Sequence, residues 1–179
     1  MSPNTRRRIL FAATGASALA AGLGWQAWQR SRSMLDGDAD AMQAFWRLEL
    51  PTPSGAALAL APLRGRPLVI NFWATWCAPC VKEMPELDRF ARAFAGQGWQ
   101  VLGVALDQLP AVQAFLQRTP VGFPIVLADT ADGLAWVRRL GNPNGGLPFS
   151  VQVGADGRVV RRKLGPTDFD ELTGWAQGS

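Results

Sequence analysis

The apolar run from Leu68 to Trp73 leads within a few residues into the motif Cys77-Ala78-Pro79-Cys80. Six nearly continuous apolar residues are typical of a strand that is buried on both faces of a sheet. Apolar side chains then recur at helical spacing from about residue 79 to 95, with Pro85 placed to kink the helix. A cysteine pair between a buried strand and a helix constrains the local architecture more than any other feature of the chain.

The remainder of the chain alternates short strands with amphipathic helices, which indicates an α/β fold. We expect strands near residues 48–50, 57–60, 100–106, 123–127, 149–153 and 158–163, and helices near residues 110–118, 132–139 and 168–177. The first two strands and the last two each form a hairpin around turn residues. Thr167, with Asp170 three residues later, is the predicted cap of the final helix. The pattern predicts a mixed central sheet flanked by helices, with an N-terminal β-hairpin extension.

The net charge of +4 comes from the N-terminal segment. Arg6, Arg7, Arg8, Arg30 and Arg32 precede residue 33 with no acid among them. Without these five, 13 of the 18 Lys and Arg residues remain against 14 Asp and Glu residues, a net charge of −1. The rest of the chain therefore has no positive excess to attract phosphates, and we expect no nucleic-acid partner.

The uncharged run of residues 9–28 would span about 30 Å as a helix, enough to cross a hydrocarbon core. We assign residues 1–30 to a signal peptide or an N-terminal membrane anchor. Small residues at 16–20 fit signal-peptidase cleavage, whereas the apolar character beyond them fits a retained anchor. The arginines before the run fit either the general or the twin-arginine export route. The polar, acidic residues 31–44 are predicted to be a linker, and the domain to span residues 45–179.

The chain has no histidine and only two cysteines. Histidine-dependent nucleophilic catalysis and imidazole metal sites are therefore excluded, and a zinc site would have at most two thiolates. Haem attachment requires histidine where Val81 stands. A purely structural disulfide is disfavoured, because closing so small a ring stabilises the fold little. Redox chemistry is the leading interpretation, and Cu(I) binding by the two thiolates stays open as the alternative.

The position of the motif explains how such redox chemistry would run. At the start of a helix, unpaired N–H groups and the helix dipole stabilise a thiolate at Cys77. Cys77 is then the nucleophile that attacks a substrate disulfide, and Cys80, one turn later, resolves the mixed disulfide. Pro79 occupies an early helical position, at which a missing N–H costs nothing. This chemistry requires no cofactor and no metal.

The longer segment Asn71-Phe72-Trp73-Ala74-Thr75-Trp76-Cys77-Ala78-Pro79-Cys80, together with Pro85 and Gly146-Leu147-Pro148, resembles the thioredoxin superfamily. The likeness is to its exported TlpA-like branch, which includes the ResA-type and cytochrome-c-maturation thioredoxins. It covers about residue 45 to the C-terminus. The resemblance implies a thioredoxin-like fold and a protein-disulfide oxidoreductase.

The same resemblance implies roles for residues outside the cysteine pair. Pro148 would be a cis-proline that packs against the disulfide, and Leu147 would offer backbone groups to a bound substrate strand. Trp76 and Pro79 are expected to contact substrate as well. Glu83 matches an acidic residue near the active site of the ResA-type branch, where it would tune the thiol pKa values or relay protons. A solvated glutamate on a helix face is the alternative.

Three positions depart from related patterns. Asn71 replaces the buried aspartate of thioredoxin and cannot take a proton from Cys80, so that task falls to Glu83 or to water. Ala78 stands where strong oxidants of the superfamily carry histidine, which predicts a more reducing pair. Ala74 stands in place of the peroxiredoxin threonine, so peroxidase activity is disfavoured.

The sequence therefore predicts an exported thiol:disulfide reductase of the periplasm, tethered to the inner membrane or soluble after signal cleavage. Its expected partners are disulfide-containing client proteins and a membrane electron donor that reduces the cysteine pair again. The resemblance suggests apocytochrome c or proteins of metal-centre assembly as clients. A general disulfide oxidant is the alternative within the same chemistry.

Overall fold

The computed structural model describes residues 25–26 and 37–178. It divides the chain into two compact units, Met1–Gly37 and Asp38–Ser179, and the second of these carries the cysteine pair. The expected signal peptide or anchor, residues 1–30, lies outside the described residues apart from Trp25 and Gln26. Within the described part of the chain, no helix is both long enough and apolar enough to span a membrane.

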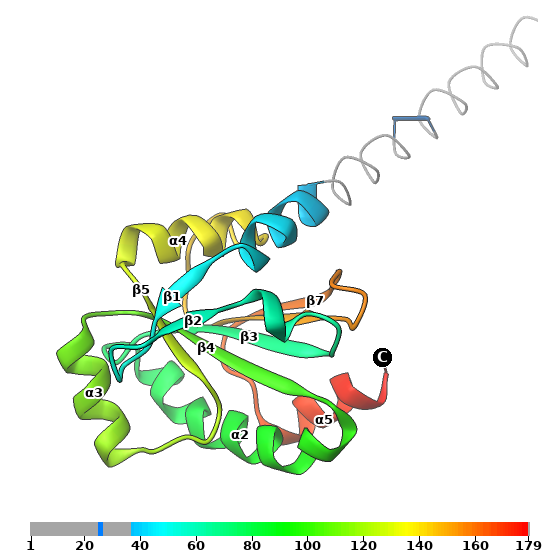
Figure 1. Cartoon of the computed structure of the whole chain (residues 1–179). Helices are drawn as coiled ribbons and strands as arrows, with labels where there is room; N and C mark the ends of the chain where they lie inside the picture. Colours follow the sequence, from blue (N-terminus) through cyan, green and yellow to red (C-terminus); the bar gives the residue numbers. More distant parts are fainter. Residues whose placement is uncertain (1–24, 27–36, 179) are drawn as a thin grey trace, which may run out of the picture. The chain divides into compact units, whose positions relative to one another are not determined.

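A five-stranded sheet forms the centre of the second unit (Figure 1). In spatial order its strands are β5 (Ile125–Ala128), β4 (Gln100–Leu106), β3 (Leu68–Trp73), β6 (Phe149–Val153) and β7 (Val159–Leu164). β3 and β5 both run parallel to β4, whereas β6 runs antiparallel to both β3 and β7. The expected hairpin is a separate two-stranded sheet of β1 (Glu49–Pro51) and β2 (Ala57–Ala59). The mixed sheet and the N-terminal hairpin are thus confirmed.

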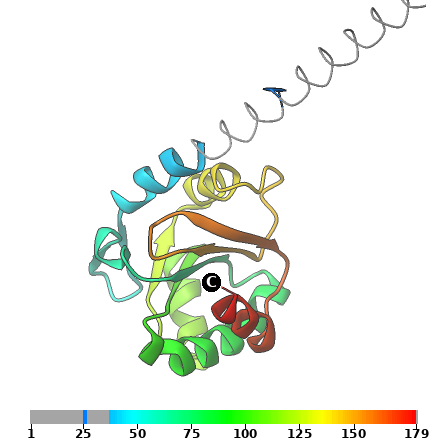
Figure 2. The ribbon, with the colours of Figure 1, turned by 90° about the vertical axis from the view of Figure 1, so that its right-hand side faces the viewer.

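Helices cover both faces of the five-stranded sheet (Figure 2). One face carries α2 (Ala78–Phe94), α3 (Leu109–Arg118) and α5 (Phe169–Gln177). The other carries α4 (Thr130–Arg139) and a helix over residues 37–46. Two short 3-10 helices, η1 (Ala61–Leu63) and η2 (Ala95–Gln97), join neighbouring elements. The helices expected after the motif, before β5 and at the C-terminus are all present within a few residues of their expected bounds.

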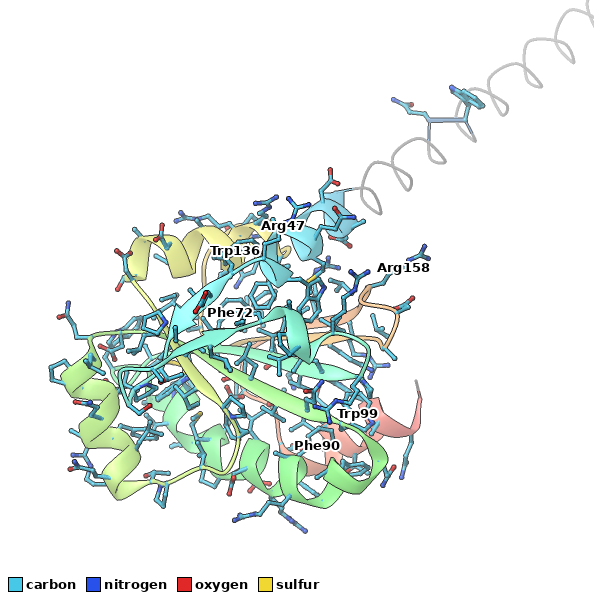
Figure 3. The ribbon with its side chains drawn as sticks, in the orientation of Figure 1. Arg47, Phe72, Phe90, Trp99, Trp136 and Arg158 are labelled. Carbon is cyan, nitrogen blue, oxygen red and sulfur yellow. A yellow bond between two sulfur atoms is a disulfide. The ribbon has the colours of Figure 1, made fainter. Side chains whose placement is uncertain are left out.

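Strand β3 contributes to two separate hydrophobic cores because its side chains alternate between the faces. Val69 and Trp73 point to the face of α2, while Phe72 points to the opposite face. Figure 3 shows both cores: Phe90 and Trp99 lie on one side of the sheet, Phe72 and Trp136 on the other. All six residues of β3 are buried, which is why the strand is apolar except at Asn71.

The structure contradicts two expectations from the sequence, one near the start of the domain and one at the last helix. Residues 37–44 do not belong to a linker: they are helical, and Ala41 and Met42 are buried in the core beneath α4. The acids at 38 and 40 are themselves part of this helix, so they do not mark a linker. Thr167 does not cap the last helix either. Asp168 does so, accepting a hydrogen bond from the Glu171 N–H at 2.8 Å.

Two helical glycines test how closely α4 packs on β4. A Cβ at Gly133 of α4 would lie 2.4 Å from Cγ of the buried Leu106, whereas a Cβ at Gly174 of α5 would meet nothing within 4 Å. Replacement of either glycine by alanine raises the helix propensity by the same amount. We therefore expect Gly174→Ala to stabilise the protein by about 0.5–1 kcal/mol, and Gly133→Ala to destabilise it by about 1–3 kcal/mol. Urea unfolding of both variants checks this, and equal effects would contradict the close packing.

Candidate redox site

Cys77 and Cys80 form a disulfide in the first turn of α2. Cys77 is the N-cap residue, with extended backbone angles, and its Sγ accepts a hydrogen bond from the Cys80 N–H at 3.3 Å. Cys77 retains 7% of its surface exposed, whereas Cys80 is completely covered. The predicted order of reaction therefore has a geometric basis. Cys77, the less deeply buried of the two, lies at the helix N-terminus, where N–H groups favour a thiolate, and Cys80 is fully covered.

The residues on either side of Cys77 present apolar surface to solvent. Trp76 is 67% exposed, and Ala78 and Pro79 are exposed as well. An exposed tryptophan is unusual on a soluble domain because its large apolar area loses contact with water only when a partner covers it. Contact of Trp76 and Pro79 with substrate stays a prediction, and their exposure is what that prediction requires.

The loop before β6 brings a second chain segment toward the same end of the sheet. Phe149 of β6 pairs with Phe72 of β3, so Pro148 lies level with the last residue of β3, four residues before Cys77. The peptide bond between Leu147 and Pro148 is cis, as expected. Leu147 is partly buried and packs against both cores. Their role in holding a substrate strand stays a prediction.

Asp107 anchors the loop that carries the motif, and the sequence interpretation missed it. It follows β4, the parallel neighbour of β3, so both chain ends leave the sheet on the same side. One carboxylate oxygen of Asp107 accepts hydrogen bonds from the backbone N–H of Thr75 at 2.8 Å and from its hydroxyl at 2.5 Å. The other accepts from the N–H of Gln108 at 2.7 Å. In the sequence, an aspartate after a strand is indistinguishable from a helix cap.

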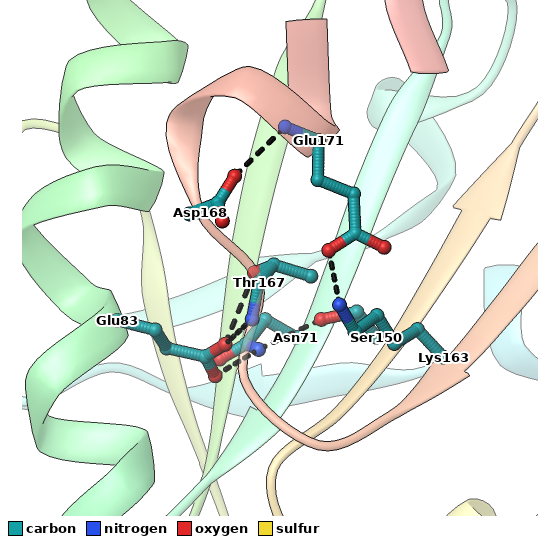
Figure 4. A network of polar contacts seen from close by, with 7 residues as sticks. All are labelled: Asn71, Glu83, Ser150, Lys163, Thr167, Asp168 and Glu171. Carbon is teal, nitrogen blue, oxygen red and sulfur yellow. Dashed lines mark hydrogen bonds and ion pairs between the residues drawn. The ribbon is translucent and has the colours of Figure 1, made fainter. Parts of the chain in front are cut away.

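Glu83 is the most unusual ionisable group of the site. It lies on α2 one turn after Cys80 and only 2% of its surface is exposed. Its Oε1 accepts a hydrogen bond from Nδ2 of Asn71 at 2.8 Å, and its Oε2 accepts from the N–H of Thr167 at 2.7 Å and from the Thr167 hydroxyl at 3.0 Å (Figure 4). The structure therefore excludes the solvated helix-face alternative for Glu83.

Burial and hydrogen bonding act on Glu83 in opposite directions. Desolvation raises the pKa of Glu83 because it disfavours the charged form, and this is the largest effect. The three hydrogen bonds and the positive charge of Lys163 lower the pKa in part. The net result is a raised pKa, which is the direction needed for a group that exchanges a proton near neutral pH.

Asn71 connects Glu83 to the neighbouring strand. Its Nδ2 also donates to the hydroxyl of Ser150 on β6 at 3.0 Å, and all three residues are buried. The amide has two N–H donors and uses both, one for each partner. The replacement of a buried aspartate by Asn71 therefore leaves one ionisable group, Glu83, at this point of the core. Among the described residues, no three His, Cys, Asp or Glu side chains are grouped to hold a metal ion.

Comparison with known proteins supports a redox role for the cysteine pair. The model of the Redoxin family matches residues 33–174. The chain belongs to the Redoxin family. It is 29% identical over 124 residues to the thiol-disulfide oxidoreductase ResA of Bacillus cereus, a match that covers 69% of each chain.

Solved structures agree as well. A thioredoxin-related protein from Neisseria meningitidis serogroup B superimposes with a TM-score of 0.65 and 30% identity, over 73% of this chain and all of that one. A secreted disulfide oxidoreductase of Mycobacterium tuberculosis, described as homologous to E. coli DsbE, superimposes with a TM-score of 0.61 and 29% identity, over 75% and 97%. The chain is a TlpA/ResA-type protein-disulfide oxidoreductase with a thioredoxin-like fold, as the resemblance implies.

The raised pKa of Glu83 predicts a stability profile. The folded protein holds the Glu83 proton more tightly than the unfolded chain, whose carboxyl titrates near 4.5. The contribution of Glu83 to stability is therefore present below pH 4.5 and is lost as the pH rises through the raised pKa. Urea unfolding of the wild type and of Glu83→Gln across this pH range isolates the contribution as a difference. If the free energy of unfolding of Glu83→Gln instead rises above that of the wild type as the pH falls, the predicted profile is wrong.

The Asp107 anchor predicts a local loss of function. Asp107→Ala removes three hydrogen bonds and should destabilise the fold by about 1–2 kcal/mol. It should also slow disulfide reduction by about 3- to 10-fold, because the loop bearing Cys77 loses its fixed position. Asp129→Ala is the matched control: Asp129 accepts from the N–H groups of Ala131 and Asp132 at the start of α4. The control should lose similar stability and keep its rate.

Proposed function

We propose that this protein is an exported reductase of disulfides in other proteins. The observation that carries the proposal is the placement of Cys77 Sγ at the N-cap of α2, where the Cys80 N–H points to it and exposed Trp76 borders it. The N–H groups at a helix N-terminus favour the thiolate form of such a cysteine, and the exposed surface beside it can meet a protein substrate. The pair needs no cofactor for this reaction.

The proposed reaction proceeds in two exchanges. The thiolate of Cys77 attacks one sulfur of the client disulfide, whose S–S bond breaks and whose other sulfur leaves as a thiolate and takes a proton. Cys80 then loses its proton and attacks Cys77, and the second client sulfur leaves and is protonated. Two electrons pass to the client, and the protein ends with the Cys77–Cys80 disulfide. A dithiol donor of the membrane would reduce it again.

The direction of electron flow is inferred from the motif. Ala78 and Pro79, the residues between the cysteines, carry no charge, so the N-terminus of α2 is the main source of stabilisation for the Cys77 thiolate. A less stabilised thiolate makes the dithiol a better reductant, because the reduced form is then less favoured. This supports a reductase over a general oxidant.

The proposed location is outside the cytoplasm. The arginine-flanked apolar segment before residue 33 and the secreted relative from Mycobacterium tuberculosis both support export. Tethering to the inner membrane and action in the periplasm follow from a retained segment. Apocytochrome c and proteins of metal-centre assembly are the candidate clients.

The equilibrium redox potential tests the direction. Equilibration of the protein with glutathione buffers, followed by alkylation of free thiols, should give a potential nearer about −250 mV than the roughly −120 mV of a strong oxidant. A potential near the oxidant's value would overturn the reductase proposal and favour an oxidant.

Trapping of clients provides the second test: Cys80→Ser should accumulate mixed disulfides through Cys77, while Cys77→Ser, the matched control, should accumulate none.

A further inference from the structure

The carboxylate of Glu83 is held by three donors that differ in one chemical respect. Nδ2 of Asn71 and the N–H of Thr167 can only donate a hydrogen bond. The hydroxyl of Thr167, 3.0 Å from Oε2, can either donate or accept after rotation about its C–O bond. Among the contacts of Glu83, the Thr167 hydroxyl is thus the one that can serve both protonation states of the carboxyl group.

We propose that Thr167 is a positioning residue for the thiol chemistry, whose hydroxyl keeps Glu83 in place whether or not Glu83 carries a proton. This role rests on the proposed function, in which Glu83 takes the proton that Cys80 releases. When Glu83 is a carboxylate, the hydroxyl donates to Oε2. When Oε2 is protonated, its O–H donates to Oγ1, while the N–H of Thr167 and the amide of Asn71 keep their bonds.

The location of Thr167 supports this role over that of an ordinary loop residue. It lies between β7 and α5, is 3% exposed, and gives both its backbone N–H and its side chain to the same carboxylate oxygen. The cap of α5 is supplied by its neighbour Asp168, so the Thr167 hydroxyl is not needed for the helix. The two hydrogen bonds of Thr167 to Glu83 therefore connect the loop before α5 to helix α2.

The charged groups around Glu83 come from three elements. β7 contributes Lys163, which is paired with Glu171 of α5 (Figure 4). α5 also contributes Asp168, whose carboxylate caps the helix. On α2, Glu86 accepts a hydrogen bond from the N–H of Phe169 at 3.3 Å. Cys80, on the same helix, lies one turn before Glu83. β3 and β6 present only the neutral Asn71 and Ser150. A substitution that removes only the Thr167 hydroxyl leaves all of these charges in place, so any change in the titration of Glu83 comes from the hydroxyl.

Replacement of Thr167 by valine tests the inference, because it removes the hydroxyl and keeps the shape and the backbone N–H. A hydrogen bond to a carboxylate is stronger than one from the neutral acid, so its loss disfavours the charged form. The titration midpoint of Glu83, followed by the NMR shift of its carboxyl carbon in the oxidised full chain in detergent micelles, should move to higher pH. Thr167→Ser should restore the wild-type midpoint.

Thr173→Val is the matched control. The Thr173 hydroxyl is buried on α5 without a hydrogen-bond partner among the described residues, so its removal should leave the Glu83 midpoint unchanged. An unchanged midpoint in Thr167→Val, or an equal shift in Thr173→Val, would overturn the positioning role and reduce Thr167 to a structural residue. If Thr167→Val does not fold, Thr167→Ser is the test: a Glu83 midpoint that differs from the wild type in this variant overturns the positioning role.

A second readout connects the hydroxyl to the reaction. The pH profile for reduction of the protein's disulfide by a small dithiol should move in the same direction in Thr167→Val. Adding Thr167→Val to Glu83→Gln should leave the profile of Glu83→Gln unchanged. An additive effect in the double variant would show that Thr167 does not act through Glu83. The NMR midpoint needs no client, so it stands even where the redox potential contradicts a reductase.

Discussion

Strand β3 is hydrogen-bonded on both edges, to β4 and β6, and packed on both faces by separate hydrophobic cores. A strand enclosed in this way can meet solvent only at its ends. The chain that leaves its C-terminal end therefore emerges at the rim of the sheet, where Cys77 begins α2. The burial of the strand thus brings the motif to the rim of the sheet, where the neighbours Trp76, Ala78 and Pro79 are exposed.

The same strand carries the polar interior of the site. Asn71 interrupts the apolar run, and its amide bridges Glu83 on α2 and Ser150 on β6. A buried carboxylate is costly without partners, and the donors of Asn71 and Thr167 offset that cost while desolvation still raises the pKa of Glu83. The balance leaves an ionisable group one turn behind the covered sulfur of Cys80. The network behind the cysteine pair thus joins two strands, a helix and a loop.

Much of the fold follows from local pattern. β3 and β4 occupy the residues expected for them, because continuous apolar runs of six or seven residues bounded by turns have few alternatives. The helix over residues 37–46 was missed because its acids mimic a linker and only tertiary contacts reveal the burial of Ala41 and Met42. The cap of α5 was misplaced by one residue, since Thr167 and Asp168 are both good caps.

The chemistry of the site can be predicted from the amino-acid sequence: two cysteines at the start of a helix, no histidine, and uncharged residues between the sulfurs favour disulfide exchange. Which other side chains gather around the cysteine pair depends on the tertiary structure. Glu83 and Thr167 are 84 positions apart, and Asp107 and Thr75 are 32 apart, and each pair meets in the folded protein. No local pattern specifies such contacts, because they depend on strand register and on how α5 packs against α2.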